Sequence, residues 1–235
     1  MSTTTGVDAE TLLAYARSLR PEIAQRALEA ERTRRLPEET VDALRDSGLL
    51  RGVLPRRFGG SGIRLIDQIE IAAELARGCG STAWVYTLLG AATSGVPSLI
   101  ADQDGREEVL SDPRAAVAAV FASDKGTAKP VGGKGSDYVV SGTWSFASGC
   151  LHAQWFSGGV TFPDGTPGAA IMRISDVTIK DVWHVAGMRG TGSNTVVANE
   201  VNVPARRVGR AADPYRGGRR PNRRRPKRTR PHRHR

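Results

Sequence analysis

The pattern of apolar residues changes once along this chain, near Ala116, and that change constrains the fold more than any other feature. From residue 8 to about residue 112, apolar residues recur at helical spacing. After that, short strand-like runs alternate with glycine-rich turns as far as about residue 208. This order predicts an α+β chain. We expect an all-helical domain over residues 1–115 and a small β-barrel or β-sandwich domain over residues 116–208.

Local signals within the helical part predict where its helices begin and bend. Asp8 is suited to cap the first helix, and Pro21 is expected to kink or restart that helix. Ser81 is suited to cap a later helix over residues 82–93. Between them, residues 63–77 predict an amphipathic helix with one broad apolar face. That face comprises Leu65, Ile66, Ile69, Ala72, Ala73 and Ala76.

The net charge of +10 is concentrated at the C-terminal end. Of the 34 Lys and Arg residues, 14 lie between Arg206 and Arg235, and the rest of the chain carries more acidic than basic residues. Residues 209–235 are rich in arginine and proline and predict a disordered tail. Such a tail could bind nucleic acid non-specifically, or could serve solubility or localisation. We favour a third origin, the out-of-frame translation of GC-rich DNA.

Other features of the composition exclude several classes of protein. Two cysteines, Cys79 and Cys150, cannot form a disulfide framework, and no metal-ligand spacing is present. No apolar run approaches the length of a spanning helix, and the N-terminus does not have the pattern of a signal peptide. We therefore expect a cytoplasmic protein without a metal site.

The sequence around Phe146 could hold a flat redox cofactor. Such a cofactor needs an apolar wall, hydrogen bonds to the edge of its ring, and close backbone approach. Phe146 or Trp144 could form the wall, Ser148 could reach a ring nitrogen, and the peptides of Ala147 and Gly149 could reach carbonyl groups. The alternative is structural, because two aromatic residues two apart on a strand share a face that is more often core.

This segment, together with residues 183–193, resembles the flavin-holding middle domain of the acyl-CoA dehydrogenase superfamily. Dehydrogenases of that superfamily carry Gly-x-Lys-x-Trp-Ile-Thr/Ser-Asn-Gly. Aligned on Gly142, Trp144 replaces the Lys, Phe146 takes the place of the Trp, and Ser148 takes the place of the hydroxyl residue. Trp-x-Phe-x-Ser-Gly is the form typical of the flavin-dependent monooxygenase branch, which this chain resembles most.

The resemblance implies roles for four further residues. Phe121 and Ser123 would belong to the loop that lies over the flavin, although Ser123 could equally begin a simple turn. Trp84 would face the substrate, or else be buried in a helical core. Arg189 would contact a flavin phosphate or an acidic group across a subunit interface, with a plain glycine hairpin as the alternative. Ala92 stands where several phenol-hydroxylating relatives have a histidine.

The activity implied is that of the oxygenase component of a two-component monooxygenase. A separate flavin reductase would deliver reduced FAD or FMN, and oxygen would form a C4a-hydroperoxide that hydroxylates an aromatic or polyketide-like substrate. Homo-oligomers, tetramers in full-length relatives, are implied as well. No residue of this chain is assigned as catalytic. The alternatives are an acyl-CoA dehydrogenase, disfavoured by the missing Lys and Thr-Glu-Pro motif, and an inactive truncated remnant or non-specific nucleic-acid-binding protein.

The resemblance extends from about residue 8 to about residue 208 and stops before the superfamily's C-terminal helical domain. In the superfamily that domain completes the flavin site and mediates tetramer packing. From this we expect weak flavin binding or none, and aggregation through helix faces left uncovered.

Overall fold

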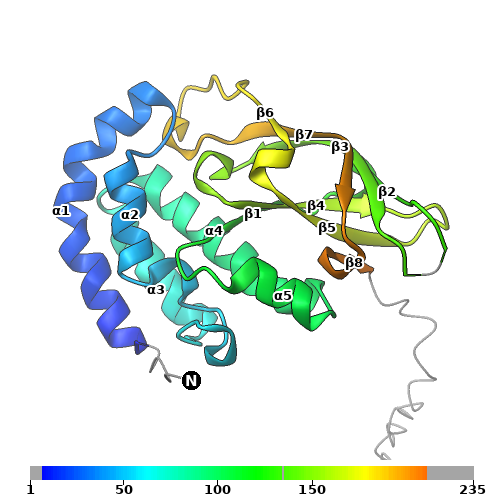
Figure 1. Ribbon diagram of the computed structural model, residues 1–235. Helices are drawn as coiled ribbons and strands as arrows, with labels where there is room; N and C mark the ends of the chain where they lie inside the picture. Colours follow the sequence, from blue (N-terminus) through cyan, green and yellow to red (C-terminus); the bar gives the residue numbers. More distant parts are fainter. Residues whose placement is uncertain (1–6, 134, 211–235) are drawn as a thin grey trace, which may run out of the picture.

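A computed structural model describes residues 7–133 and 135–210, with the helices on one side of the molecule and the strands on the other (Figure 1). The basic tail predicted for residues 209–235 lies outside the described residues from position 211 onward. The α-helices are α1 (Ala9–Thr33), α2 (Glu38–Asp46), α3 (Leu65–Ala76), α4 (Gly80–Leu99) and α5 (Gln103–Leu110). Strands follow from Val117, which confirms the predicted α+β class.

Helix α1 begins as predicted and is not restarted at Pro21. The Asp8 side chain accepts a hydrogen bond from the backbone N–H of Thr11 at 2.8 Å, which confirms the N-cap. Pro21, however, lies inside an uninterrupted helix. The buried residues before and after it, such as Ala16 and Ile23, belong to the same hydrophobic core. We attribute the continuity of α1 to this packing, which offsets the hydrogen bond that proline removes.

The apolar face predicted for α3 is wrong. The buried residues are Gln68, Ile71 and Leu75, and this stripe packs between α1 and α4. Leu65, Ile66 and Ile69 of the predicted face are exposed by 66%, 50% and 55% of their surfaces. Both stripes of the helix carry apolar side chains, so periodicity alone could not show which one meets the neighbouring helices.

These exposed residues of α3 give a prediction for solution behaviour. Replacing Leu65, Ile66 and Ile69 together by glutamine is expected to reduce self-association, because it removes a contiguous apolar patch. The free energy of unfolding should change by less than about 1 kcal/mol, since the side chains are already largely in water. Light scattering and denaturant titration measure the two effects. The control, Ile71→Gln at a fully buried position, should unfold the protein, and equal effects of both changes would contradict this assignment of faces.

Helix α4 runs between the other helices and the sheet, contacting both α3 and β1 (Val117–Val120). It begins at Gly80, with Cys79 as the N-cap residue, and not at Thr82 with Ser81 as the cap. It also continues past the predicted end at residue 93 to Leu99. Because it borders the strands along much of its length, α4 carries the helical side of the candidate site.

The strands form one sheet in the order β6-β7-β3-β2-β4-β5-β8, with β1 parallel to β4 beside this path. Besides β1 they are β2 (Gly126–Pro130), β3 (Tyr138–Ala147), β4 (Trp155–Thr161), β5 (Pro167–Arg173), β6 (Thr178–Lys180), β7 (Asn194–Val203) and β8 (Val208–Arg210). The predicted strand-like runs all fall within or beside strands; they were residues 117–121, 138–140, 143–146, 155–156, 169–174, 177–179 and 195–203. Strands β2 and β8 were missed in the sequence. Both are short, and the Gly-Thr-Ala-Lys-Pro of β2 has little apolar content.

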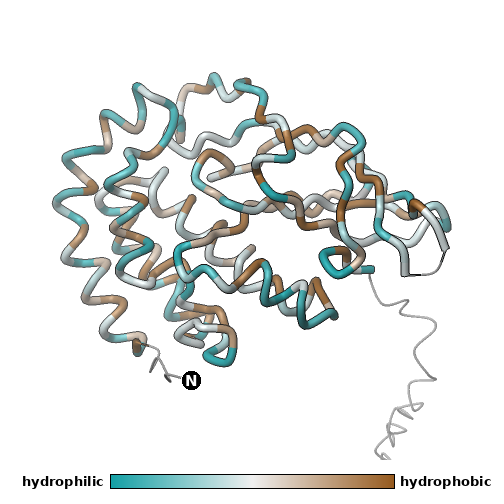
Figure 2. The backbone as a smooth tube through the Cα atoms, in the orientation of Figure 1, coloured by the Kyte–Doolittle hydropathy of each residue, from teal (hydrophilic) through white to brown (hydrophobic). Residues whose placement is uncertain are grey.

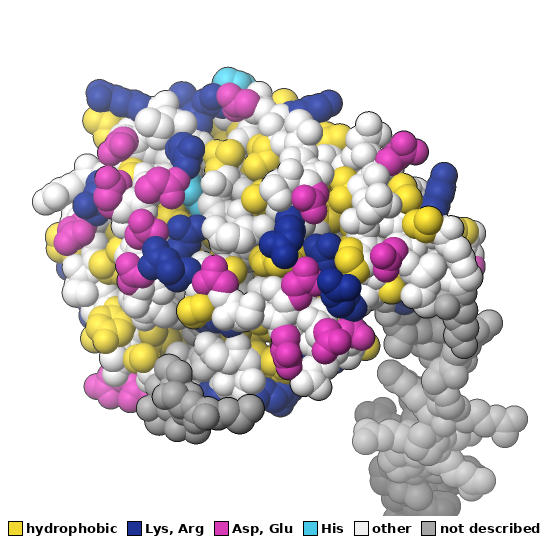
Figure 3. Space-filling model, in the orientation of Figure 1, with side chains coloured by type: hydrophobic (Ala, Val, Ile, Leu, Met, Phe, Trp, Pro, Cys, Tyr) yellow, Lys and Arg dark blue, Asp and Glu magenta, His cyan; other side chains and the backbone are white. Residues whose placement is uncertain are grey.

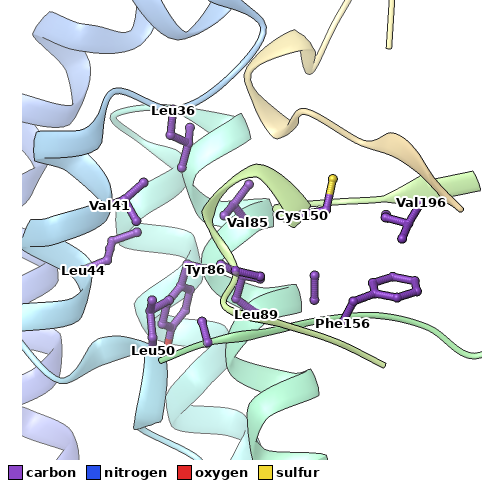
Figure 4. Close-up of a cluster of buried hydrophobic side chains, with 14 of the residues drawn as sticks. Leu36, Val41, Leu44, Leu50, Val85, Tyr86, Leu89, Cys150, Phe156 and Val196 are labelled. Carbon is purple, nitrogen blue, oxygen red and sulfur yellow. The ribbon is translucent and has the colours of Figure 1, made fainter. Parts of the chain in front are cut away.

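One hydrophobic core joins the helices to the sheet. It runs from Leu44 of α2 through Leu89 of α4 to Phe156 of β4 (Figure 4). Hydrophobic residues accordingly recur along the backbone of both halves (Figure 2). On the face shown in Figure 3, basic and acidic side chains are interspersed. Within the described ranges, no helix has the length and apolar character needed to cross a membrane.

Candidate functional site

An open cavity of about 410 Å³ lies where α4 meets the end of β3 and the segment that leads into β7. Its walls are mainly aromatic and apolar, with three hydroxyl groups set among them. The lining residues are Trp84, Leu88, Phe146, Ser148, Trp183, Met188, Thr191 and Ser193. A volume of this size and a lining of this kind are typical of small-molecule sites. The cavity brings together Trp84, Phe146 and Ser148, three of the residues singled out in the sequence.

A β-bulge turns Phe146 toward the cavity. Between Trp144 and Ala147, β3 advances three residues while its partner β7 advances two, from Val196 to Asn194. Phe146 adopts a φ of 63°, which is unfavourable for a residue other than glycine by roughly 1–3 kcal/mol. Its ring is 71% exposed and meets Trp183 edge to face, with centroids 6.0 Å apart.

The same bulge separates the two aromatic residues that the sequence left as alternatives for the wall. Trp144 is fully buried in the sheet, packs against Phe156 with the two rings tilted by 58°, and donates from Nε1 to the carbonyl of Gly159 at 2.9 Å. It is therefore a core residue and cannot form the wall of this cavity. Phe146 is the aromatic residue of the segment that faces the cavity.

Ser148 occupies the centre of a buried hydrogen-bond chain at the floor of the cavity. Its Oγ accepts from Trp84 Nε1 at 3.1 Å and lies 2.7 Å from the Oγ of Ser193. Ser193 in turn lies 2.7 Å from the hydroxyl of Thr191. Trp84, half-exposed at 47%, lies at the rim of the cavity and does not occupy a helix core.

The short 3₁₀ helix η6 (Arg189–Thr191) holds this chain against the helices. Gly190 approaches α4 so closely that a Cβ atom there would lie 3.0 Å from the Ser81 side chain. The carbonyl of Met188, at the start of η6, accepts three hydrogen bonds. They come from the backbone N–H and the hydroxyl of Thr191 and from Nε1 of Trp183. The position of Trp183 is thereby tied to that of Thr191.

Of the other residues predicted for the cofactor, Phe121, Ala147 and Arg189 do not line this cavity. Phe121 directly follows β1 and is 59% exposed, and Ser123 begins the 3₁₀ helix η3 (Ser123–Lys125). The side chain of Ala147 is buried in the core. Arg189 is half-buried, and its Nε has no hydrogen-bond partner among the described residues. Roles for these residues remain predictions.

The peptide N–H of Gly149, predicted to reach the cofactor, is already bonded within the protein. It donates to the carbonyl of Thr191 at 3.0 Å. This bond closes the loop between the end of β3 and η6, so the amide is used to hold the site together and is not directed into the cavity.

Five lining residues were given no role from the sequence: Leu88, Trp183, Met188, Thr191 and Ser193. Thr191 and Ser193 flank Gly192 in a stretch whose glycines suggested only a hairpin. The signal available in the sequence was a hydroxyl residue on each side of Gly192, which adopts a φ of 52° in the structure. This signal could not be interpreted, because nothing in the sequence spacing shows that Ser148 lies beside these two hydroxyl groups.

Two buried titratable groups lie beyond Ser148 in the short helix η4 (Cys150–His152). Burial raises the pKa of the Cys150 thiol to about 11, so the thiol stays protonated and is no nucleophile. Burial, with Arg35 and Arg45 nearby, lowers the pKa of His152 to about 4. Neutral His152 accepts a hydrogen bond at Nε2 from the backbone N–H of Leu36 at 3.2 Å. Both groups stabilise structure and do not face the cavity.

The arrangement suits a flat, amphipathic ring. Phe146 and Trp183 offer aromatic surfaces, and Ser148 offers a polar atom whose other partners are already fixed. Across residues 7–133 and 135–210, no group of three or more His, Cys, Asp or Glu could hold a metal ion. What the site can do chemically is bind a ring, orient one of its edge atoms, and exclude water around it.

The chain matches one family model and several known proteins. Residues 9–110 match the family described as acyl-CoA dehydrogenase, N-terminal domain. The oxygenase subunit HsaA of a flavin-dependent monooxygenase from Mycobacterium tuberculosis (strain ATCC 25618 / H37Rv) is 40% identical over 205 residues. These are 85% of this chain and 50% of HsaA. The oxygenase component of an FADH(2)-dependent resorcinol hydroxylase from Rhizobium sp. (strain MTP-10005) is 35% identical over 77% of this chain and 44% of its own.

Solved structures agree with these matches. The crystal structure of the HsaA monooxygenase from M. tuberculosis has a TM-score of 0.79 at 39% identity, covering 87% of this chain and 56% of that one. XiaF from Streptomyces sp., solved in complex with FADH2 and glycerol, has a TM-score of 0.76 at 32% identity, covering 86% and 51%. This chain thus spans about half the length of the relatives it matches.

Proposed function

Because the chain belongs to the flavin-dependent monooxygenase branch of the acyl-CoA dehydrogenase superfamily, we propose that it is an oxygenase component that binds reduced flavin. With molecular oxygen it would hydroxylate an aromatic or polyketide-like substrate. The single observation that carries this proposal is the cavity in which Phe146, Ser148 and Trp84 meet. This chain spans about half the length of the oxygenase subunit HsaA that it matches.

Each lining residue has a part in this proposal. The rings of Phe146 and Trp183 would pack on the isoalloxazine, and Ser148 would bond its N5 edge. Trp84 and Leu88 would face the substrate and exclude water. Bound reduced flavin would supply the two electrons needed to activate oxygen. We further propose that Phe121, Ser123 and the Ala147 peptide contact the flavin from outside the cavity, and that Arg189 contacts its phosphate or an acidic group of a second subunit.

The proposal extends to partners and organisation. A separate flavin reductase would deliver the reduced flavin, as FAD or FMN, and the chain would form a homo-oligomer in the cytoplasm. The helical region over residues 1–115 and the sheet region over residues 116–208 would act as two domains whose junction carries the site. Nucleic acid would bind only non-specifically, through the basic tail. Acyl-CoA dehydrogenation is disfavoured, because the residue aligned with the expected lysine is Trp144, which is sealed in the sheet.

The test is consumption of flavin and oxygen. The protein, mixed anaerobically with dithionite-reduced FMN or FAD to millimolar concentration, is expected to show saturable quenching of tryptophan fluorescence. On exposure to oxygen without substrate, every reduced flavin yields one H₂O₂ in the end, so the rate is measured. Ser148→Ala should increase the rate of H₂O₂ release, because the edge contact is lost.

The matched control is Ser145→Ala. Ser145 is an exposed serine three residues earlier whose hydroxyl accepts from Thr195 at 3.3 Å, and it does not line the cavity. It should leave H₂O₂ release unchanged. No saturable quenching by either reduced flavin would refute the proposed function.

A further inference from the structure

Four consecutive hydrogen bonds connect the rim of the cavity to a backbone carbonyl. They run from Trp84 Nε1 to Ser148 Oγ at 3.1 Å, to Ser193 Oγ at 2.7 Å, to Thr191 Oγ1 at 2.7 Å, and to the Met188 carbonyl at 2.9 Å. Ser148, Ser193 and Thr191 are exposed by only 6%, 4% and 2%. Water therefore has little access to replace a missing partner, and the hydroxyl groups depend on one another.

The chemistry of the two ends determines the direction of the protons. The indole N–H of Trp84 can only donate, and the carbonyl of Met188 can only accept. Each of the three hydroxyl groups between them has one proton to give. All four bonds form together only when Ser148 donates to Ser193, Ser193 donates to Thr191, and Thr191 donates to the carbonyl.

In this arrangement Ser148 cannot donate into the cavity. Its proton points away toward Ser193, and one of its lone pairs already accepts from Trp84. The lone pair that remains can accept a hydrogen bond from a ligand. Reversing the chain would let Ser148 donate into the cavity, but the bond from Thr191 to Met188 would then be lost.

We propose that Thr191 and Ser193 are positioning residues that hold Ser148 as a hydrogen-bond acceptor toward the flavin, so that the site discriminates between flavin redox states. The inference rests on the proposed function. The N5 atom of reduced flavin carries a proton and donates to such an acceptor. The bare N5 of oxidised flavin needs a donor, and obtains one only if the chain reverses. The chain orients Ser148 and does not conduct protons, because it ends at a carbonyl that has no proton to pass on.

Counting bonds gives the expected effect of removing a link. With the full chain, binding of reduced flavin adds one hydrogen bond. Binding of oxidised flavin also adds one, but the bond from Thr191 to the Met188 carbonyl is lost when the chain reverses. In Thr191→Val or Ser193→Ala the hydroxyl protons are no longer held in the direction of the Met188 carbonyl. Ser148 is then free to donate a hydrogen bond into the cavity. Oxidised flavin should then bind about three- to tenfold more tightly, the worth of one net hydrogen bond, while the affinity for reduced flavin changes less than about twofold.

The experiment measures dissociation constants of oxidised and dithionite-reduced FMN under anaerobic conditions. The indole N–H resonance of Trp84 in ¹⁵N-labelled protein serves as reporter up to millimolar FMN. Thr191→Ser keeps the hydroxyl and should retain the wild-type ratio of the dissociation constants for oxidised and reduced FMN. Thr87→Val removes a bond of the same kind, from a threonine hydroxyl to the Ala83 carbonyl at 2.8 Å, outside the chain. It should leave the ratio unchanged.

The outcomes separate this inference from the proposed function. Tighter binding of oxidised FMN by both Thr191→Val and Ser193→Ala supports the inference. An equal loss of affinity for oxidised and reduced FMN refutes it and leaves the proposed function standing. If wild type binds neither form, the proposed function fails. Neutron diffraction from deuterated crystals then decides the direction of the chain without any flavin. Deuterium on Thr191 directed at the Met188 carbonyl supports the proton order, and deuterium on Ser148 directed into the cavity overturns it.

Discussion

Trp144→Ala is expected to lower the free energy of unfolding by about 3–5 kcal/mol, the usual cost of truncating a buried aromatic residue. The indole is fully buried, lies 5.4 Å from the ring of Phe156, and donates to the Gly159 carbonyl. Three glycines leave room for it. A Cβ at Gly126, Gly142 or Gly158 would come within 2.4–2.6 Å of the ring. Neighbouring strands therefore cannot collapse into the space without breaking their pairing.

Denaturant unfolding followed by circular dichroism measures this change. Trp84→Ala is the matched control, since it truncates the same residue type at a position that is 47% exposed. It should cost no more than about 1 kcal/mol. Similar losses for the two variants would contradict the placement of Trp144 in the core and Trp84 at the rim.

Stability is expected to fall by up to about 3 kcal/mol between pH 6.5 and pH 4 because of His152 alone. Burial is the main cause of its lowered pKa, about 4 against an ordinary 6.5, and Arg35 and Arg45 add to it. The unfolded chain binds a proton at this residue near pH 6.5, whereas the folded protein does so only near pH 4. Stability is therefore fully present above pH 6.5 and is lost as the pH falls through this window.

Urea titrations at several pH values from 7 to 4 measure how the free energy of unfolding changes with pH. His152→Gln keeps an acceptor for the Leu36 N–H without a titrating ring, and should flatten the dependence on pH in this range. Aspartates with lowered pKa values, such as Asp8 and Asp67, lose their contribution only below pH 3.8. A wild-type profile that is flat from pH 6.5 to 4 would refute the role given to His152.

Features that depend on neighbouring residues in the chain could be predicted from sequence. The change from helix to strand near Ala116, the Asp8 cap and most of the strands are of this kind, because spacing and capping chemistry determine them locally. The candidate residues Phe146, Ser148 and Trp84 were also identified, and the structure brings them to one cavity. That part of the prediction came from resemblance to a family, since the residues alone favoured a core strand.

Features that depend on distant residues could not be predicted. Strand alternation places Trp144 and Phe146 on one face, and a bulge whose register is set by β7 separates them. The buried stripe of α3 is decided by α1 and α4, because its own pattern is apolar on more than one side. The hydroxyl groups of Thr191 and Ser193 gain significance only when Ser148, more than forty residues earlier, lies beside them.

The triple acceptor at Met188 restricts how this site can evolve. One oxygen atom holds both the indole that borders the cavity and the threonine that ends the hydroxyl chain. A mutation that rotates this peptide to widen the cavity for a bulkier substrate would also release the threonine. If the proposed function holds, substrate range and cofactor preference would therefore change together, and a variant selected for one would also be altered in the other.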